Sequence, residues 1–254
     1  AKDENGVNRK RSVSISDTTE TTQMRENLNL INNALSKHWY DLEIPDQELS
    51  DLQRRLSDDQ ENERTIRMDQ RFLHRVFNDP DLQTGGRFYG GWWQNIPREY
   101  RPYLAVNGKR MVELDYSNQH PSILYAQEGV IRPADCYSGV INPSQLTDEF
   151  RHGELRDTVK AAFNAMLNSP KPLRQAPAGV KPSKFGLKWA ELSNAIIAFH
   201  EPIAHHFYTG VGLRLQRLDS DIAEKVLVHF AEKGIAILPL HDSFLMHQGY
   251  ETTL

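Results

Sequence analysis

The dipeptide Asn107-Gly108 constrains the fold of this chain more than any other local feature. It stands between two apolar, β-branched runs, and Asn-Gly in that setting is the strongest short-range signal for a two-residue hairpin turn. The second run, about Lys109 to Leu114, places Asp115 directly at its end. The sequence therefore predicts an antiparallel pair of strands that presents a carboxylate at one end.

A second strand, turn and strand follow near the end of the sequence. Residues 235–240 form a short apolar run, His241-Asp242-Ser243 interrupts it, and Phe244-Leu245-Met246 resumes it. Helical patterns lie between the two strand pairs. We therefore expect an α+β fold, in which an antiparallel sheet carries Asp115 and Asp242, flanked by helices and preceded by an N-terminal helical region.

Apolar residues recur at helical spacing in six segments, and each predicts an amphipathic helix. These are about 21–39, a leucine stripe after Pro45, 64–77, 147–167, 187–207 with a break near Pro202, and 219–233. We divide the chain into a mobile tail at 1–20, a helical region at 21–78 and a larger region at 79–254.

Composition excludes several classes of protein. The net charge of −4 argues against a globally basic nucleic-acid binder, but an enzyme needs only a local basic channel. No apolar run approaches the roughly 20 residues of a membrane helix, and the polar first residues lack the apolar core of a signal peptide. The single cysteine, Cys136, excludes an internal disulfide. We expect a cytoplasmic protein with no membrane partner.

Two clusters have ordinary explanations. Potential metal ligands gather at His200, Glu201, His205 and His206. Their spacing is not that of an HExxH motif, and Pro202 interrupts the helix that such a motif requires, so we expect no zinc site. The pair Trp92-Trp93 could stack on bases, but its position beside glycines favours packing.

Asp115 and Asp242 are the candidate catalytic residues. Each carboxylate is flanked by apolar strand residues, and a carboxylate in such a setting usually has a partner. Phosphoryl transfer is served by two divalent ions roughly 4 Å apart, held by carboxylates from separate strands. Mg²⁺ suits a few carboxylates completed by phosphates and water, and Mn²⁺ could replace it.

A basic stretch supplies cations that phosphates need. Arg156 and Lys160 stand at i and i+4, on one face of an expected helix, where they could clamp phosphate oxygens. From 158 to 190 every charged residue is basic, which predicts a strip that faces phosphate. These residues are Lys160, Lys171, Arg174, Lys181, Lys184 and Lys188.

The order of these segments resembles the palm and fingers of family A DNA polymerases and the related phage-type single-subunit RNA polymerases. ELDYSNQHPSILYA resembles motif A, LRDTVKAAFN resembles motif B, and PLHDSFLM resembles motif C. GRFYGGWWQNIP is similar to the segment before motif A, and LQRLDSDIAEKVL to the palm helix before motif C. The resemblance covers about Gly85 to Gln248.

The resemblance implies a role for each matching position. Asp115 and Asp242 would bind two Mg²⁺ ions, assisted by the Tyr116 carbonyl. The incoming triphosphate and its base or sugar would meet Arg156, Lys160, and Phe163 or Asn164, with His120 at the position that governs sugar choice. The primer end or minor groove would meet Arg87, Gln216 and His241.

The chain also departs from the family pattern. The intervals from Asp115 to Lys160 and to Asp242 are short, so the fingers, about 147–210, would be reduced. Asn168 stands where motif B usually has a tyrosine. The helical region at 21–78 would be the candidate for a thumb-like bundle.

We therefore expect a nucleotidyltransferase that takes nucleoside triphosphates and a primer-template, with template-directed DNA synthesis as the leading interpretation. One alternative is an RNA polymerase, a primase or a template-independent terminal transferase. A further alternative is a polymerase-derived nucleic-acid-binding module that has lost catalysis.

Overall fold

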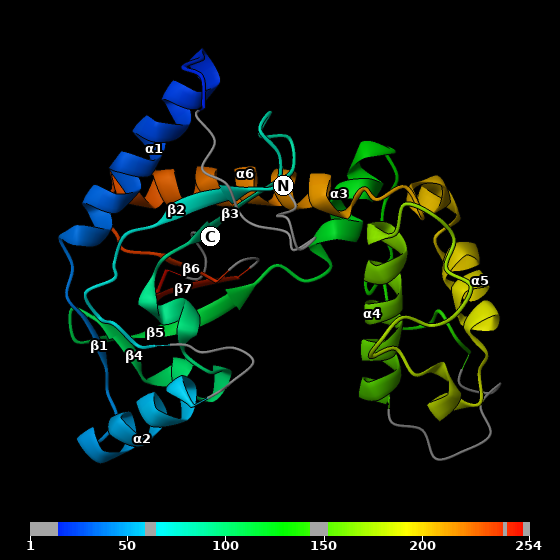
Figure 1. Ribbon diagram of the computed structural model, residues 1–254, viewed down its shortest axis with the longest axis horizontal. Coiled ribbons are helices and arrows are strands. Elements are labelled where there is room, and N and C mark those ends of the chain that lie inside the picture. Colours follow the sequence, from blue (N-terminus) through cyan, green and yellow to red (C-terminus); the bar gives the residue numbers. More distant parts are fainter. Residues whose placement is uncertain (1–14, 59–64, 143–151, 241–242, 251–254) are drawn as a thin grey trace, which may run out of the picture. The chain divides into compact units, whose positions relative to one another are not determined.

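The computed structural model describes residues 15–58, 65–142, 152–240 and 243–250. These residues belong to two compact units (Figure 1). Unit 1 draws on Ala1–Asp115 and Ser220–Leu254, and unit 2 is Tyr116–Asp219. The chain leaves unit 1 after Asp115 and returns to it within helix α6 (Gly212–Glu232).

Unit 1 is built on a five-stranded antiparallel sheet with the order β1-β4-β5-β7-β6. The strands are β1 (Tyr40–Leu42), β4 (Leu104–Val106), β5 (Lys109–Asp115), β6 (Leu238–Leu240) and β7 (Ser243–His247). The expected hairpin is confirmed, because Asn107 and Gly108 have φ of 53° and 70°, as a type I′ turn requires. The predicted α+β class with an antiparallel sheet is confirmed as well.

The N-terminal third joins this sheet instead of forming a separate helical region. β1 pairs with β4 at the edge of the sheet. The first two expected helices are confirmed as α1 (Thr19–Ser36) and α2 (Asp46–Ser57). Helix α1 begins inside the segment expected to be a tail, because Thr18 caps it: the Thr18 hydroxyl accepts from the Thr21 amide at 3.1 Å.

The third expected helix, at 64–77, is wrong. Its end is strand β2 (His74–Phe77), which pairs with β3 (Gly85–Tyr89) in a separate two-stranded sheet. The side chain of Asn32 on α1 holds the backbone of Leu73 extended: it accepts from the Leu73 amide at 2.8 Å and donates to the Leu73 carbonyl at 2.9 Å. Tertiary hydrogen bonding thus overrides the helical spacing of the apolar residues.

Arg75 on β2 anchors the β2–β3 hairpin to α6. Its guanidinium donates to Glu224 at 2.8 Å and to Asp221 at 3.1 Å, and its Nε donates to the Gly86 carbonyl at 2.8 Å. The rings of Phe77 and Phe88 lie 5.1 and 5.2 Å from the guanidinium carbon. Burial lowers the pKa of Arg75, and the Glu224 carboxylate opposes this shift.

Two short 3₁₀ helices, η1 (Trp92–Asn95) and η2 (Arg98–Tyr103), lead from β3 into the main sheet. Trp92 and Trp93 are fully buried, so the packing interpretation is confirmed. The indole nitrogen of Trp93 donates to the Pro239 carbonyl at 3.1 Å, and Gln94 donates to the same carbonyl at 3.1 Å. The QNIP segment therefore ties β6 to the rest of unit 1.

Helix α6 begins seven residues before the start of the expected segment at Asp219 and ends just before Gly234, whose φ is 68°. Its buried side in unit 1 is formed by Ala223, Leu227 and Phe230. Ile222, which we placed on the apolar face, is 39% exposed. Apolar spacing located the helix but misplaced one edge of its buried stripe.

Unit 2 is helical. It contains α3 (Gln119–Gln127), α4 (His152–Asn168), η4 (Pro182–Phe185), α5 (Trp189–Phe199), η5 (Glu201–His206) and the first part of α6. The expected break near Pro202 is confirmed as the change from α5 to η5. Helices α4 and α5 lie side by side (Figure 1). Part of the helix expected at 147–167 lies outside the described residues.

The centre of unit 2 is a cluster of aromatic rings around a buried histidine. His200 is fully buried; its Nε2 lies 2.8 Å from the Cys136 carbonyl and its Nδ1 lies 3.0 Å from the Tyr125 hydroxyl. The carbonyl can only accept, so Nε2 carries the proton and Nδ1 accepts from the tyrosine. Burial lowers the pKa of His200, and the bond to Cys136 opposes the shift.

Candidate active site

The end of strand β5 is the part of the structure that best matches the expected reaction centre. Asp115 is the last residue of β5 and is exposed. In the antiparallel ladder Asp115 pairs with Ser243, the first residue of β7. Ser243 directly follows Asp242 in the chain, and Asp242 and His241 lie outside the described residues. The register therefore brings Asp115 opposite the chain neighbour of the second predicted aspartate.

A third carboxylate, which sequence analysis missed, lies on the same strand. Glu113 is two residues before Asp115, so both point to one face of the sheet. Its Oε1 accepts from Arg101 at 2.8 Å and from the Ser243 hydroxyl at 3.0 Å. The hydrogen bond from Ser243 to Glu113 links the end of β5 to the start of β7. The period of two along ELD was the signal that could have identified Glu113.

A cavity of about 300 Å³ lies beside this network. Its polar lining comes from Arg98, Arg101 and Glu113, and its apolar lining includes Met111 and Leu245. The two arginines come from the Gly- and Pro-rich segment before the hairpin, through η2. Unit 1 thus has cationic side chains next to the strand that carries Asp115, in addition to the arginine expected on β3.

Arg87, that expected arginine, pairs with Val76 across the β2–β3 hairpin and is half-buried. Gln216 lies on the part of α6 that belongs to unit 2 and is half-buried. Both remain candidates for nucleic-acid contact, because neither is enclosed in a core.

In unit 2, Arg156 on α4 already has an acidic partner. Its Nε donates to Asp135 at 2.7 Å, and its guanidinium carbon lies 5.4 Å from the centre of the Tyr137 ring. Burial raises the pKa of Asp135, but hydrogen bonds from Arg156, Tyr137 and Ser138 outweigh it and hold that pKa well below its usual value. A phosphate would have to compete with Asp135 for Arg156.

Phe163 needs a correction. It is fully buried, and its ring packs edge-on against His200 at 4.9 Å, Phe207 at 5.2 Å and Tyr137 at 5.6 Å. Such a side chain builds the core and is closed to a nucleotide base. Of the two neighbours that we considered, the half-buried Asn164 is the accessible one.

Tyr116 and His120 flank the start of α3. Both are half-buried, and burial raises the pKa of the Tyr116 hydroxyl. Between them Asn118 adopts a left-handed conformation with φ of 59°, and its carbonyl accepts from the Ser122 amide at 2.8 Å as the helix begins. This turn sets the direction in which α3 leaves the segment after Asp115.

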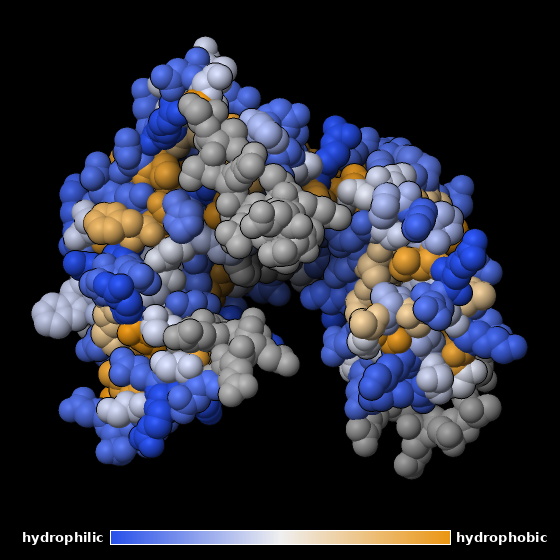
Figure 2. Space-filling model, viewed as in Figure 1, coloured by the Kyte–Doolittle hydropathy of each residue, from blue (hydrophilic) through white to orange (hydrophobic). Residues whose placement is uncertain are grey.

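The predicted basic strip faces solvent. All six of its side chains are exposed, and none of them has an ion pair among the residues that the structure describes. Figure 2 shows hydrophilic residues over much of the visible face of unit 2, with apolar residues scattered between them. The strip thus meets one requirement for attracting phosphate, which is access to unpaired cations.

None of the helices in the described ranges combines the length and the apolar character that crossing a bilayer demands. Comparison with protein-family models, with curated proteins and with solved structures finds no match to this chain. The relationship to the polymerases therefore stays a prediction from the motifs.

Proposed function

We propose that this protein is a nucleotidyltransferase that adds nucleotides to the 3′ end of a nucleic acid by two-metal phosphoryl transfer, with template-directed DNA synthesis as the leading assignment. The observation that carries the proposal is the register of β5 and β7. Asp115 stands opposite Ser243, and Ser243 follows Asp242 in the chain. A pair of divalent ions requires carboxylates held side by side, and this pairing predicts that arrangement for Asp115 and Asp242.

The donor set fits Mg²⁺, which prefers carboxylate oxygens completed by phosphate and water. Asp115 and Asp242 would hold the ions, and the Tyr116 carbonyl would assist. When bound, the ions would supply charge stabilisation to the attacking and leaving oxygens. The exposure of Asp115 at a strand end leaves room for a triphosphate.

The surrounding residues would position the two aspartates and attract the negatively charged phosphates. The Arg101–Glu113–Ser243 network joins the two strand ends, so it would fix the spacing of the aspartates. Lys160 and the rest of the basic strip would attract the triphosphate or the nucleic-acid backbone. Arg156 would contribute only where a phosphate displaces Asp135 from the guanidinium or binds the guanidinium together with it.

The ion pair between Arg156 and Asp135 favours one second candidate, a nucleic-acid-binding module without catalysis. In that case the exposed lysines would bind backbone phosphates, and the carboxylates would have no catalytic role. Such a module would bind nucleic acid with a strong salt dependence and incorporate no nucleotide.

The test is a primer-extension panel that crosses DNA and RNA templates with deoxy- and ribonucleotides, with a template-free lane for each. We expect incorporation with Mg²⁺, and a loss of about 10³-fold, or about 4 kcal/mol, in both Asp115→Asn and Asp242→Asn. The matched control is Asp41→Asn, an exposed aspartate in strand β1 of the same sheet, which should retain full activity.

The lanes also separate the alternatives. Extension without template would identify a terminal transferase, and preference for ribonucleotides would identify an RNA-synthesising enzyme. Retention of nucleic-acid binding with no incorporation in any lane would reject the enzyme and support the binding module. Equal activity in Asp115→Asn and wild type would reject Asp115 as a metal ligand.

A further inference from the structure

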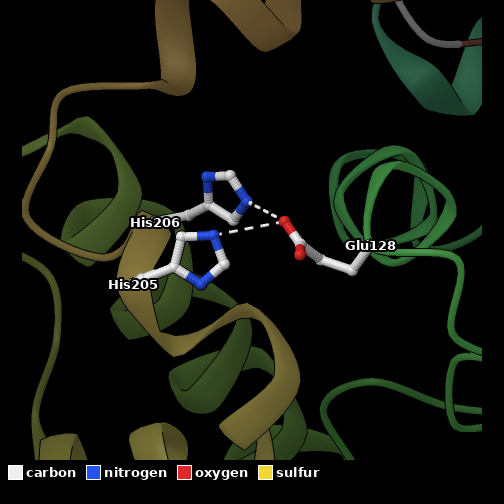
Figure 3. A group of neighbouring side chains, drawn as sticks. All are labelled: Glu128, His205 and His206. Carbon is white, nitrogen blue, oxygen red and sulfur yellow. Dashed lines mark hydrogen bonds and ion pairs between the residues drawn. The ribbon is translucent and has the colours of Figure 1, made fainter.

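Glu128, His205 and His206 converge in unit 2, and none of them is among the residues assigned above (Figure 3). The Oε1 atom of Glu128 lies 3.2 Å from Nε2 of His205 and 3.0 Å from Nε2 of His206. The two imidazole rings lie 4.1 Å apart between centroids, at an interplanar angle of 38°. One carboxylate oxygen therefore meets two imidazole nitrogens at nearly equal distance.

Two separate elements supply these side chains. Glu128 caps the C-terminal end of α3, and both histidines end the short helix η5. We expected no zinc site here because the spacing of the histidines is not that of an HExxH motif and Pro202 interrupts the helix that such a motif requires. The structure shows that the third donor comes from another helix, 77 positions before His205 in the chain, which no motif search around the histidines would find. His200 and Glu201 are not part of this group.

The spacing of the donor atoms suits a tetrahedral metal ion. Zinc lies about 2.0–2.1 Å from imidazole nitrogen and carboxylate oxygen, so two of its ligands are separated by roughly 3.3 Å. The two nitrogen-to-oxygen distances are close to that edge length, and one atom from each of the three residues lies within 4.8 Å of the others.

The donor chemistry selects the metal. Two imidazoles and one carboxylate favour Zn²⁺ and its transition-metal neighbours over Mg²⁺, which prefers oxygen alone. His205 is 60% exposed along its side chain, which leaves a path for an ion and a fourth position for water.

We propose that Glu128, His205 and His206 form a binding site for a borderline transition-metal ion such as Zn²⁺. The ion would cross-link the end of α3 to η5, and so stabilise the connection between α5 and α6. This site is independent of the proposed Mg²⁺ centre, since the two share no ligand and none of these three residues has a role in the proposed phosphoryl transfer.

The experiment measures binding and needs no enzyme activity. Metal-free full-length protein is titrated with ZnCl₂ by calorimetry in a large excess of Mg²⁺, which occupies oxygen-only sites. A parallel titration with Co²⁺ follows visible absorption, which reports tetrahedral nitrogen and oxygen ligands. We expect at least a tenfold loss of Zn²⁺ affinity at this site in Glu128→Gln, His205→Gln and His206→Gln.

The matched control is His229→Gln, which removes an exposed histidine from α6 in unit 1 and should leave the titration unchanged. Circular dichroism shows whether each variant is folded, and Glu128→Gln preserves side-chain shape. Equal Zn²⁺ affinity in wild type and all three variants would overturn the site. So would the absence of wild-type binding below millimolar Zn²⁺, because the three groups would then form a hydrogen-bonded cluster only.

Discussion

The two units differ in the charge of the polar group that each one buries. Unit 1 buries the guanidinium of Arg75 and surrounds it with carboxylates and a backbone carbonyl. Unit 2 buries His200, lowers its pKa, and satisfies both ring nitrogens with neutral partners. In both units the interior polar group is already satisfied and serves the scaffold. A reaction centre is therefore better sought at exposed positions such as Asp115, and this contrast can be tested in each unit.

The largest effect is expected from Phe163→Ala in unit 2. The ring is fully buried among other aromatic rings, so its removal leaves a cavity and should lower the free energy of unfolding by about 3–5 kcal/mol. Urea unfolding measures the change. The control Ile131→Ala, at a side chain 95% exposed, should cost under about 0.5 kcal/mol. A loss of nucleotide binding at unchanged stability would instead restore Phe163 as a ligand contact.

A smaller loss is expected in unit 1 from Glu224→Gln. This change removes the charge that faces Arg75, but Asp221 and the Gly86 carbonyl still accept from the guanidinium. A hydrogen bond to a charged group is worth about 1.5–3 kcal/mol, so we expect a loss of about 2 kcal/mol on urea unfolding. Glu232→Gln, exposed on the same helix, is the control. Equal stability of the two variants would show that the ion pair between Arg75 and Glu224 does not stabilise unit 1.

The third prediction concerns pH and has the smallest effect. Because burial lowers the pKa of His200, the unfolded chain takes up this proton first as pH falls below about 6.5. The contribution of His200 to stability is therefore complete above that pH and is lost as pH falls towards the folded pKa. Unfolding measured between pH 7.5 and 5.5 should show this decline, and His200→Gln should flatten it.

His247 in unit 1 provides the comparison for this measurement. Burial lowers its pKa too, and its Nε2 lies 3.0 Å from the Val106 carbonyl. His247→Gln should flatten a separate part of the decline. A wild-type stability that is constant or rises on acidification would show that neither histidine is held neutral by the fold.

The sequence was most informative where one local rule decides the structure. Asn107-Gly108 predicted the hairpin because few residues tolerate the positive φ that its turn requires. The strand expected to resume at Phe244 is β7, which begins one residue earlier, at Ser243. The helix predicted at 64–77 was wrong because the side chain of Asn32, on another element, holds the backbone of Leu73 extended. Long-range hydrogen bonds of this kind leave no trace in apolar spacing.

In the candidate site, too, local sequence rules predicted some features, and long-range packing determined the others. Asp115 could be placed from its strand, and Glu113 could have been placed with it from the period of two. The helix with Arg156, Lys160 and Phe163 was located correctly, but helical spacing does not say which face is buried. Only the packing of unit 2 shows that Phe163 is interior and that Arg156 meets Asp135.

The most direct test of the proposed reaction centre is a crystal structure of the protein with Mn²⁺ and a nucleoside triphosphate, in which anomalous scattering locates the ions. We predict a peak within about 2.5 Å of carboxylate oxygens from both Asp115 and Asp242, with a second ion roughly 4 Å away. Carboxylates separated by more than about 10 Å, with no peak between them, would contradict the account.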